Sequence, residues 1–452
     1  MHTHSSYDVI IIGAGYAGLA AGLALQKAGK KILLLEARNR CGGRILTEYF
    51  TADQYTDLGG QWIGPGHERM YALANEFGVV TFPTHDAGKS SLLLNGKLKL
   101  YKGIIPPLPL FALLSVDRAI RKINKLAKTI DLEKPFASPH AVEWDSMSLA
   151  DWMQQQMKNE TARKMFAVAA EAVFATNAST LSFLHALFYI KSSGNLDYLM
   201  NIHKGAQQDR IKGGAQSICI KIAEAIGSAI QYEKIVTQIN QDENGVRVSG
   251  DGFGFYASHC IVAIPPVAAT DIDFSPAVPE AQWNLMKASF MGTVVKCYAV
   301  YATPFWRKDF KNGLVAAPDE MTSVVFDNSP WDGSKGILMG FCLAEKAKQL
   351  MQHNMAERQE LVKAGFVQMF GPAAAKLEHY IDKSFTEEPF TKGCYAGMFP
   401  PGMLTQYNAS LATPFQRIHW AGTETSTHFN GYMEGAVRSG ERAAKEILVS
   451  GK

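Results

Sequence analysis

The feature that most constrains this chain is a glycine-rich segment close to its beginning. An apolar run at Val9–Ile12 leads into Gly13-Ala14-Gly15-Tyr16-Ala17-Gly18, and residues 19–29 continue with the apolar spacing of a helix. A second apolar run, Ile32–Leu35, ends at Glu36. Two buried parallel strands, a helix between them, glycines in the first turn and an acid after the second strand are typical of a dinucleotide-binding fold.

Each part of this pattern has a physical reason. The glycines allow a tight turn and a close approach of the backbone to a pyrophosphate, which lies at the start of the helix. An acid at position 36 can accept hydrogen bonds from ribose hydroxyls, and it favours FAD or NAD over a cofactor with a phosphorylated ribose. We therefore predict that the nucleotide is bound by Gly13, Ala14, Gly15, Gly18 and Glu36.

The residues that follow favour FAD over NAD. Gly42 and Gly43 allow a second close passage of the chain, and Arg44 can pair with a pyrophosphate through two hydrogen bonds. A dehydrogenase that exchanges NAD does not need this second clamp, whereas a permanently held dinucleotide does. The loop Leu58–Pro65 then places small residues where a flat ring system could approach the backbone. To the cofactor site we add Arg38, Gly43, Arg44, Gly60, Gln61 and Trp62.

Composition excludes several classes of protein. With 45 Lys+Arg, 42 Asp+Glu and a formal charge of +3 over 452 residues, the chain lacks the basic excess of a dedicated nucleic-acid binder, so we expect no nucleic-acid partner. Its six cysteines form no C-x-x-C pair and no zinc spacing, which predicts free thiols and no metal. No apolar stretch reaches the roughly 18 residues of a membrane span. The run Val9–Ile12 is too short for a secretory signal. We therefore expect a cytoplasmic protein without a membrane anchor.

The alternation of segment types predicts two interleaved domains of an α/β protein. Residues 86–208 are rich in helices and apolar aromatics, and residues 286–386 form a second block without nucleotide-binding character. Both interrupt segments with the character of a nucleotide-binding domain. We assign residues 1–85, 209–285 and 387–452 to a discontinuous, Rossmann-like FAD-binding domain. The intervening residues, 86–208 and 286–386, form an α+β substrate-binding domain.

Several long motifs resemble the flavin-containing monoamine oxidases. The strongest are Lys392-Gly393-Cys394-Tyr395-Ala396-Gly397-Met398-Phe399-Pro400-Pro401-Gly402 and the segment from Trp420 to Ala436, which contains Gly422-Thr423-Glu424 and Gly431-Tyr432-Met433. Shorter ones are Met291–Cys297, Pro304–Lys308 and Met339-Gly340-Phe341. The resemblance covers about residues 7 to 448. It implies membership of the amine-oxidase superfamily, in the monoamine-oxidase branch. The sequence departs from the mitochondrial members of the family in that it ends at Lys452 without their membrane-anchoring helix, and we expect a soluble enzyme.

The resemblance implies roles for individual residues. Cys394 occupies the position of a cysteine that forms a thioether with the flavin, and Lys296 that of a lysine that reaches the flavin through a water. Tyr395 and Tyr432 match the two tyrosines that flank the amine. Trp62 stands where a tyrosine is usual. The cofactor site gains Val236, Gly422, Glu424 and Met433, and the substrate site gains Gln207, Phe341 and Met200, with Val324 near a gating position.

The function that these residues imply is oxidative deamination of a primary monoamine with FAD and O2, giving an aldehyde, ammonia and hydrogen peroxide. The alternative is a diamine or polyamine oxidase resembling putrescine oxidase, which would need a carboxylate in the cavity. The candidates for that carboxylate are Glu171, Asp197 and Asp327. A cationic clamp for an amino-acid carboxylate is not evident, and a flavoprotein without turnover would not need Lys296, Tyr395 and Tyr432. A homodimer is possible on this resemblance.

Overall fold

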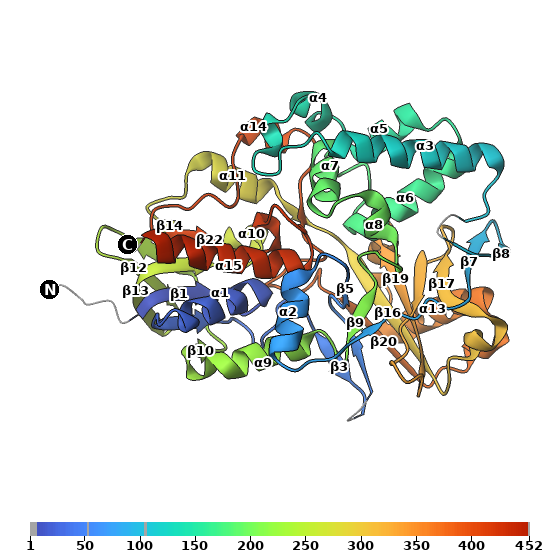
Figure 1. The fold of residues 1–452 in the computed structure, drawn as a ribbon, viewed down its shortest axis with the longest axis horizontal. Helices are drawn as coiled ribbons and strands as arrows, with labels where there is room; N and C mark the ends of the chain where they lie inside the picture. Colours follow the sequence, from blue (N-terminus) through green and yellow to red (C-terminus); the bar gives the residue numbers. More distant parts are fainter. Residues whose placement is uncertain (1–6, 52–53, 104–105, 451–452) are drawn as a thin grey trace.

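The computed structural model describes residues 7–51, 54–103 and 106–450, and it contains two large sheets at opposite ends of an elongated molecule (Figure 1). The first sheet has eight strands in the order β10-β2-β1-β13-β12-β11-β14, and β22 pairs with β13. Its strands are β1 (Tyr7–Ile12), β2 (Ile32–Leu35), β10 (Ile230–Gln231), β11 (Gln238–Gln241), β12 (Val246–Gly250), β13 (Phe253–Val262), β14 (Asp273–Ser275) and β22 (Ile418–Trp420).

Both faces of this sheet are covered, which explains why its central strands are continuous apolar runs. Val9 and Ile11 of β1 pack with α1 (Tyr16–Lys27), α9 (Gln216–Ile226) and α15 (Met433–Ser450). Ile10 and Ile12 face the other way, into the largest core cluster. Helices α1 and α15 touch closely, because a Cβ on Gly440 would lie 2.0 Å from the carbonyl oxygen of Ala17. The predicted strands at 9–12 and 32–35 and the helix between them are confirmed.

The second sheet has seven strands in the order β20-β16-β19-β18-β17-β7-β8. These are β7 (Lys89–Leu94), β8 (Lys97–Tyr101), β16 (Val294–Tyr301), β17 (Lys311–Ala316), β18 (Val324–Asp327), β19 (Gly336–Leu343) and β20 (His379–Ser384). Every residue of β16 and β19 is buried, including Lys296, which lies directly opposite Phe341. A lysine is therefore held in the core of an apolar sheet.

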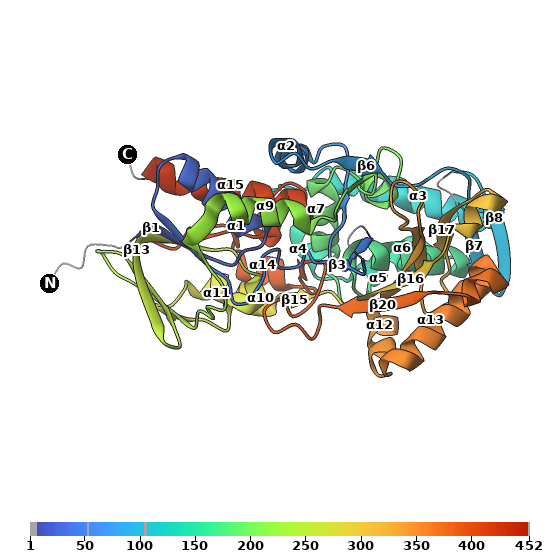
Figure 2. The same ribbon diagram turned by 90° about the horizontal axis from the view of Figure 1, so that it is seen from below.

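Helices cover the second sheet on both sides. A group of helices lies over it at the top of Figure 1, and α12 and α13 lie on the other side in Figure 2. The covering group is α3 (Leu110–Ala127), α4 (Ala141–Asp145), α5 (Leu149–Gln156), α6 (Glu160–Phe174), α7 (Phe183–Ser192) and α8 (Leu196–Met200). On the opposite side are α12 (Ala344–Met351) and α13 (Met355–Phe370).

Short elements join these two halves. Small sheets are formed by β3 (Thr47–Tyr49) with β4 (Tyr55–Asp57), by β5 (Trp62–Ile63) and β6 (Thr81–Pro83) with β9 (Asp209–Ile211), and by β15 (Phe290–Met291) with β21 (Gly397–Met398). The remaining helices are α2 (Glu68–Glu76), α10 (Pro266–Ala269), α11 (Glu280–Ala288) and α14 (Met403–Tyr407). Each large sheet is built from separated segments, as expected for interleaved domains, although the domain boundaries themselves stay a prediction.

Candidate active site

The first glycine turn has the geometry that the sequence predicts. Gly13 has φ +99, and a Cβ there would lie 2.8 Å from the side chain of Ile264. A Cβ on Gly18 would lie 1.9 Å from the carbonyl oxygen of Gly13, so only glycine lets the helix start so close to the turn. Glu36 is buried at the end of β2 and accepts hydrogen bonds from the backbone N–H of Ala14 at 2.7 Å and of Arg38 at 2.9 Å. The turn and the acid therefore form one unit.

The second glycine pair lies against the first turn. The N–H of Gly42 donates to the carbonyl of Ala14 at 2.8 Å, and Gly15 and Gly42 form a parallel β-bridge. A Cβ on Gly43 would meet the Cα of Gly15 at 3.5 Å, whereas a Cβ on Gly15 would meet nothing nearer than 4.0 Å. Two loops distant in sequence thus form one cradle with backbone groups at its surface.

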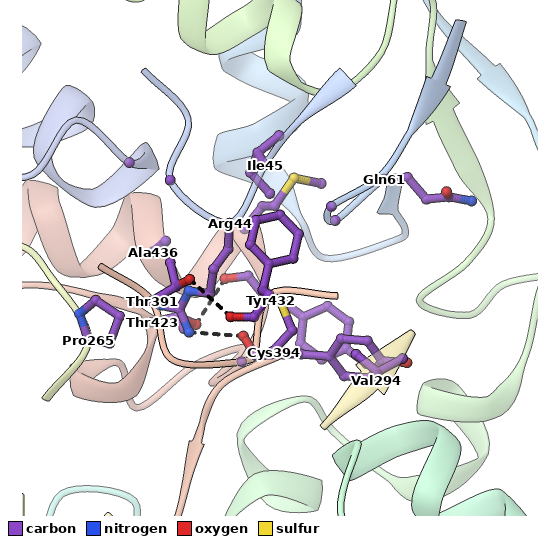
Figure 3. Close-up of a pocket in the computed structure, with 18 of the residues that line it drawn as sticks. Arg44, Ile45, Gln61, Pro265, Val294, Thr391, Cys394, Thr423, Tyr432 and Ala436 are labelled. Atoms are coloured by element: carbon purple, nitrogen blue, oxygen red, sulfur yellow. Dashed lines mark hydrogen bonds between the residues drawn. The ribbon is translucent and has the colours of Figure 1, made fainter. Parts of the chain in front are cut away.

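Arg44 has protein partners that the sequence did not predict. Its guanidinium pairs with Glu424, with Nη1–Oε1 at 2.5 Å and Nη2–Oε2 at 3.1 Å, and Nη1 also donates to the carbonyl of Tyr395 at 2.9 Å. Arg44 lines the cavity and joins the second glycine loop to the segment that carries Tyr395 (Figure 3). Its contact with a pyrophosphate stays a prediction.

One cavity of about 690 Å³ joins the glycine cradle to the predicted reaction centre. At one end it is lined by Gly13, Gly15, Glu36, Arg38 and Gly43, and at the other by Lys296, Cys394, Tyr395 and Tyr432. The lining also includes Arg44, Gly60, Gln61, Trp62, Val236, Gly422 and Met433. Ala14, Gly18 and Glu424 do not line it; they hold the residues that do. An elongated cavity with a phosphate-sized cradle at one end fits a dinucleotide such as FAD.

Lys296 donates three hydrogen bonds from its Nζ. The acceptors are the carbonyl of Asp57 at 2.7 Å, the carbonyl of Gly59 at 2.8 Å and Oε1 of Gln61 at 2.9 Å. Burial lowers the pKa of Lys296 to about 7, while the carboxylate of Asp57 opposes this change. The side chain is 5% exposed, so its charge is held by oriented oxygens rather than by solvent.

Cys394, Tyr395 and Tyr432 all line the cavity, and Figure 3 shows Cys394 and Tyr432 near one another. Cys394 follows Gly393, whose φ is +143, and its N–H donates to the carbonyl of Gly292 at 3.0 Å. Burial raises the pKa of the Cys394 thiol to about 12, so the resting sulfur is protonated. Burial also raises the pKa of both tyrosines, which keeps both phenols neutral.

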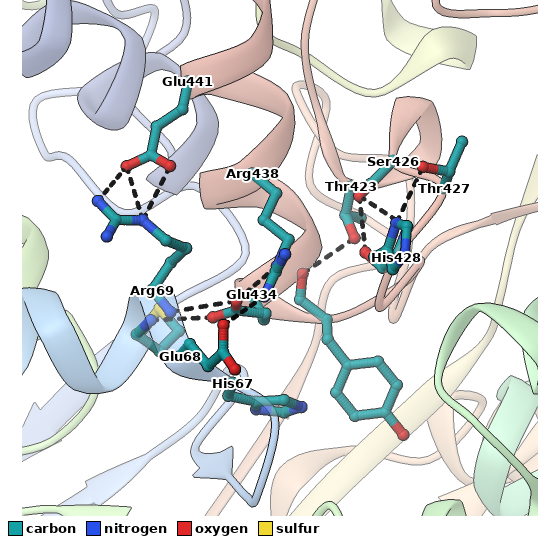
Figure 4. A network of polar contacts seen from close by, with 12 residues as sticks. His67, Glu68, Arg69, Thr423, Ser426, Thr427, His428, Glu434, Arg438 and Glu441 are labelled. Carbon is teal, nitrogen blue, oxygen red and sulfur yellow. Dashed lines mark hydrogen bonds and ion pairs between the residues drawn. The ribbon is translucent and has the colours of Figure 1, made fainter.

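A polar network at the start of α15 (Figure 4) supports the adjacent residue Tyr432. The hydroxyl of Thr423 donates to its carbonyl at 2.9 Å, and the buried ring of His67 packs 5.5 Å from its ring. Two residues further on, Glu434 accepts hydrogen bonds from the N–H groups of Arg69 and Met70 at the start of α2. The position of the ring is therefore set by two helices that meet here.

The substrate side of the cavity has an aromatic wall. The ring of Trp62 lies 4.9 Å from Phe326 and 6.1 Å from Phe341, and Phe341 lies 6.2 Å edge-on to Tyr395. The predicted residues Gln207, Met200 and Val324 also line the cavity. Trp62, predicted at the cofactor, is thus a neighbour of substrate-side residues as well.

None of the three carboxylates proposed for a diamine site lines the cavity described in the structure. Asp327 is buried and accepts from Trp306 Nε1 at 2.8 Å and from Arg307 Nε at 2.7 Å. Asp197 accepts from Asn124. Glu171 is half-buried on α6, where Lys346 attracts it. Among the described residues the only acids that line the cavity are Glu36 and Asp271, and Asp271 pairs with Lys392.

Sequence reasoning missed several residues of this site. Tyr189 lines the cavity beside Tyr432, with ring centroids 6.2 Å apart, and a Cβ on Gly431 would strike it. Phe326 completes the aromatic wall. Asn328 lies behind Gln61, with Gln61 Nε2 donating to its Oδ1 at 2.8 Å. The sequence offered only the glycine at position 431 as a signal, and the structure shows that this residue has φ +85 and packs against Tyr189.

Comparison with known proteins agrees with this geometry. Residues 16–448 match the family described as flavin containing amine oxidoreductase. The chain is 37% identical over 445 residues, 98% of its length and 97% of the relative, to the probable flavin-containing monoamine oxidase A of Dictyostelium discoideum. A solved structure of putrescine oxidase bound to putrescine has a TM-score of 0.94 at 32% identity, covering 98% of this chain and 99% of that one. Cyclohexylamine oxidase from Brevibacterium oxydans IH-35A has the same TM-score and coverage at 30% identity.

The fold and the site together define a flavoprotein oxidase. The chain belongs to the flavin-containing amine oxidoreductase family, and it is an FAD-dependent amine oxidase. In the part of the chain that the structure describes, no helix is long and apolar enough to cross a membrane.

Proposed function

We propose that this enzyme oxidises a primary monoamine to an aldehyde. Overall, R–CH2–NH2, O2 and water give R–CHO, ammonia and hydrogen peroxide. The observation that carries this proposal is that Lys296, Tyr395 and Tyr432 line one end of a cavity whose other end is the glycine cradle. When bound, FAD supplies the two-electron acceptor for the amine and passes the electrons to oxygen.

The chain's own residues hold FAD and orient the amine. The cradle of Gly13, Gly15 and Gly43 would receive the pyrophosphate, and Glu36 would accept hydrogen bonds from the ribose. Tyr395 and Tyr432 would present their faces to the amine. Because both phenols are neutral, this end of the cavity carries no phenolate that would favour an ammonium, and the amine nitrogen keeps its lone pair.

The aromatic wall supports a monoamine rather than a diamine. A second ammonium beside Trp62, Phe326 and Phe341 would be buried without a partner, at a cost of several kcal/mol. The diamine alternative rests on the likeness to putrescine oxidase. Against it, two of the carboxylates that the sequence offers for a second ammonium already have other partners. Asp327 accepts a hydrogen bond from Arg307, and Lys346 attracts Glu171.

A peroxide assay with several amines tests this choice. Benzylamine, cyclohexylamine, hexylamine, putrescine and spermidine are compared at equal enzyme concentration. We expect the monoamines to exceed putrescine at least about tenfold in kcat/KM, which corresponds to about 1.4 kcal/mol. A preference for putrescine would replace this proposal with the diamine alternative.

The tyrosine pair is tested by substitution. Tyr395→Ala and Tyr432→Ala should lower kcat/KM at least about tenfold while FAD stays bound, because each removes a ring face from the amine. Tyr395→Phe and Tyr432→Phe keep the face and should lose much less. Equal kinetics for wild type and both alanine variants would assign these tyrosines to packing alone.

We propose further that Cys394 carries FAD covalently. A thioether between Sγ and a ring methyl group removes one hydrogen from each, and oxygen takes up both as hydrogen peroxide. The thiol lines the cavity beside Tyr395, and the cations Arg44 and Lys296 partly offset the effect of burial on it. Acid-precipitated protein should stay yellow and exceed the mass of the polypeptide by one FAD. Cys260→Ala should behave in the same way, and Cys394→Ala should release its FAD.

The location that we propose is the cytoplasm. All six cysteines are free and buried, which suits a reducing compartment. Cell fractionation with a peroxide assay would test this, and activity confined to another fraction would contradict it. A homodimer stays a prediction, which sedimentation at several concentrations would decide.

A further inference from the structure

A chain of buried polar side chains leads from Lys296 away from the cavity. Nζ of Lys296 donates to Oε1 of Gln61 at 2.9 Å, Nε2 of Gln61 donates to Oδ1 of Asn328 at 2.8 Å, and Nδ2 of Asn328 donates to Oγ1 of Thr56 at 3.1 Å. Thr56, Gln61 and Asn328 are each at most 1% exposed. Since each amide accepts at its oxygen and donates from its nitrogen, the direction of the whole chain is fixed.

This chain decides where the ammonium of Lys296 can lie. Two of its three acceptors are the backbone carbonyls of Asp57 and Gly59, which cannot move independently of the chain. Gln61 is the one acceptor that could rotate away, and Asn328 prevents this by holding the other end of the amide. Gln61 directly precedes β5 and Asn328 directly follows β18, so the contact joins the small sheet that contains β5 to the second large sheet.

Other charged and titratable groups face Lys296 from several elements. Asp57 of β4 favours the ammonium, Arg210 of β9 opposes it, and the thiol of Cys394 lies nearby. On the sheet, the rings of Tyr298 and Phe341 have centroids 5.4 Å and 5.9 Å from Nζ. The carboxylate of Asp57 and the guanidinium of Arg210 act in opposite directions, and among the described residues Gln61 is the one side chain that accepts a hydrogen bond from Nζ.

We propose that Gln61 and Asn328 are positioning residues for Lys296, which hold its ammonium at the Cys394 end of the cavity and keep it charged. This inference depends on the proposed function in one respect, which is that FAD occupies the Cys394 end of the cavity. Without the Gln61 oxygen, one N–H of a buried ammonium lacks an acceptor, and the neutral amine becomes easier to form. Gln61→Met and Asn328→Leu should therefore lower the pKa of Lys296.

The first readout is the pH dependence of flavin reoxidation. Enzyme reduced with dithionite is mixed with O2, so the result does not depend on the identity of the amine. The rate constant of reoxidation is plotted against pH, and the ionisation that is lost from this profile in Lys296→Met, called here the Lys296 limb, reports Lys296. In Gln61→Met we expect the midpoint of this limb to shift to lower pH by about one unit or more, a tenfold change in the ionisation constant. Gln61→Glu keeps an acceptor and adds negative charge, so it should shift the midpoint to higher pH.

The second readout is the midpoint potential of bound FAD as a function of pH, measured by spectroelectrochemistry without turnover. A charged Lys296 favours the reduced, more negative flavin, so the potential of Gln61→Met should begin to fall at lower pH than that of wild type. Asn328→Asp keeps the acceptor for Gln61 and should not shift the ionisation of Lys296 to lower pH, whereas Asn328→Leu should.

Tyr301→Phe is the matched control. It lies on β16 like Lys296 and loses a buried hydrogen bond to the carbonyl of Ala374, but it does not touch Lys296. We expect its reoxidation limb to stay at the wild-type pH. The proposal is overturned if the limb is unmoved in both Gln61→Met and Asn328→Leu, or if Tyr301→Phe moves it equally. If Gln61→Met does not fold, Asn328→Leu against Asn328→Asp decides the matter alone.

Discussion

Two buried groups of charges act on the thiol of Cys394, and they are neutralised in different ways. Arg44 and Glu424 form a two-bond ion pair, and Glu424 also accepts from the N–H of Gly397 at 3.0 Å. Lys296, Asp57 and Arg210 influence one another electrostatically, but their hydrogen bonds go to other groups. Asp57 Oδ1 accepts from Thr47 and from the N–H of Ala215, and Arg210 donates to the carbonyl of Ser329.

The difference appears in the proton affinities. Burial opposes both charges of the pair, yet Glu424 raises the pKa of Arg44 and Arg44 lowers the pKa of Glu424. In the other group burial prevails: the pKa of Asp57 is raised and that of Lys296 falls to about 7. Asp57 Oδ2 and Arg210 Nε have no hydrogen-bond partner within the described ranges. A matched pair therefore serves as a fixed clamp, whereas an unmatched group can change charge near neutral pH.

Breaking the clamp should have the largest effect. Arg44→Met leaves the buried carboxylate of Glu424 unpaired, and we expect a loss of about 3–5 kcal/mol in the free energy of unfolding together with a smaller share of protein that carries FAD. The double variant Arg44→Met/Glu424→Gln should lose less than the sum of the two single changes, because no charge is left alone. Urea unfolding measures both.

The exposed pair Arg121–Asp117 provides the control for this prediction. Arg121→Met should cost less than about 1 kcal/mol, since solvent already screens the pair. If Arg44→Met were equally mild, the contrast between clamp and unmatched group would be lost.

Removing the charge from the unmatched group should have the opposite sign. Because burial lowers the pKa of Lys296 from 10.5 to about 7, the unfolded chain holds a proton between these pH values that the folded chain does not. The cost of burying the ammonium is therefore complete below pH 7 and disappears as the pH rises toward 10.5. Lys296→Met should raise Tm by about 2–4 °C at pH 6 and by much less at pH 9.5. A gain independent of pH would mean that Lys296 is not charged when buried.

Much of the glycine cradle for the cofactor could be predicted, because the residues that indicate it lie close together in the sequence. The turn at Gly13–Gly18 and the acid at position 36 lie within one strand–helix–strand unit, and the spacing alone implies their geometry. Cys394, Tyr395 and Tyr432 came from long motifs shared with a family, and the structure brings them to one cavity end. The predicted strands and helix of this unit were correct for the same reason.

The polar partners could not be predicted because they are distant in the chain. Arg44 and Glu424 are 380 positions apart, and Gln61 and Asn328 are 267 apart. No period or spacing connects such residues. Asp327 was a reasonable candidate for the cavity until the fold directed it to Trp306 and Arg307. Lys296 did give a signal, since a lysine inside an apolar strand needs acceptors, but sequence does not say which ones.

The smallest effect is expected from substituting Glu171. This substitution tests whether a half-buried carboxylate that forms no ion pair among the described residues takes part in substrate binding. Burial raises the pKa of this carboxyl, so the folded state bears a cost that grows as the pH rises above 4.5 and becomes constant once the pH exceeds the folded-state pKa. Glu171→Gln should therefore be neutral or stabilising, within about 0.5 kcal/mol, at pH 7. Because Glu171 is not among the residues that line the described cavity, the ratio of kcat/KM for benzylamine to that for putrescine should stay within about twofold of wild type. A large loss of putrescine oxidation in this variant alone would show that the carboxylate turns toward the cavity in solution and pairs with a second ammonium.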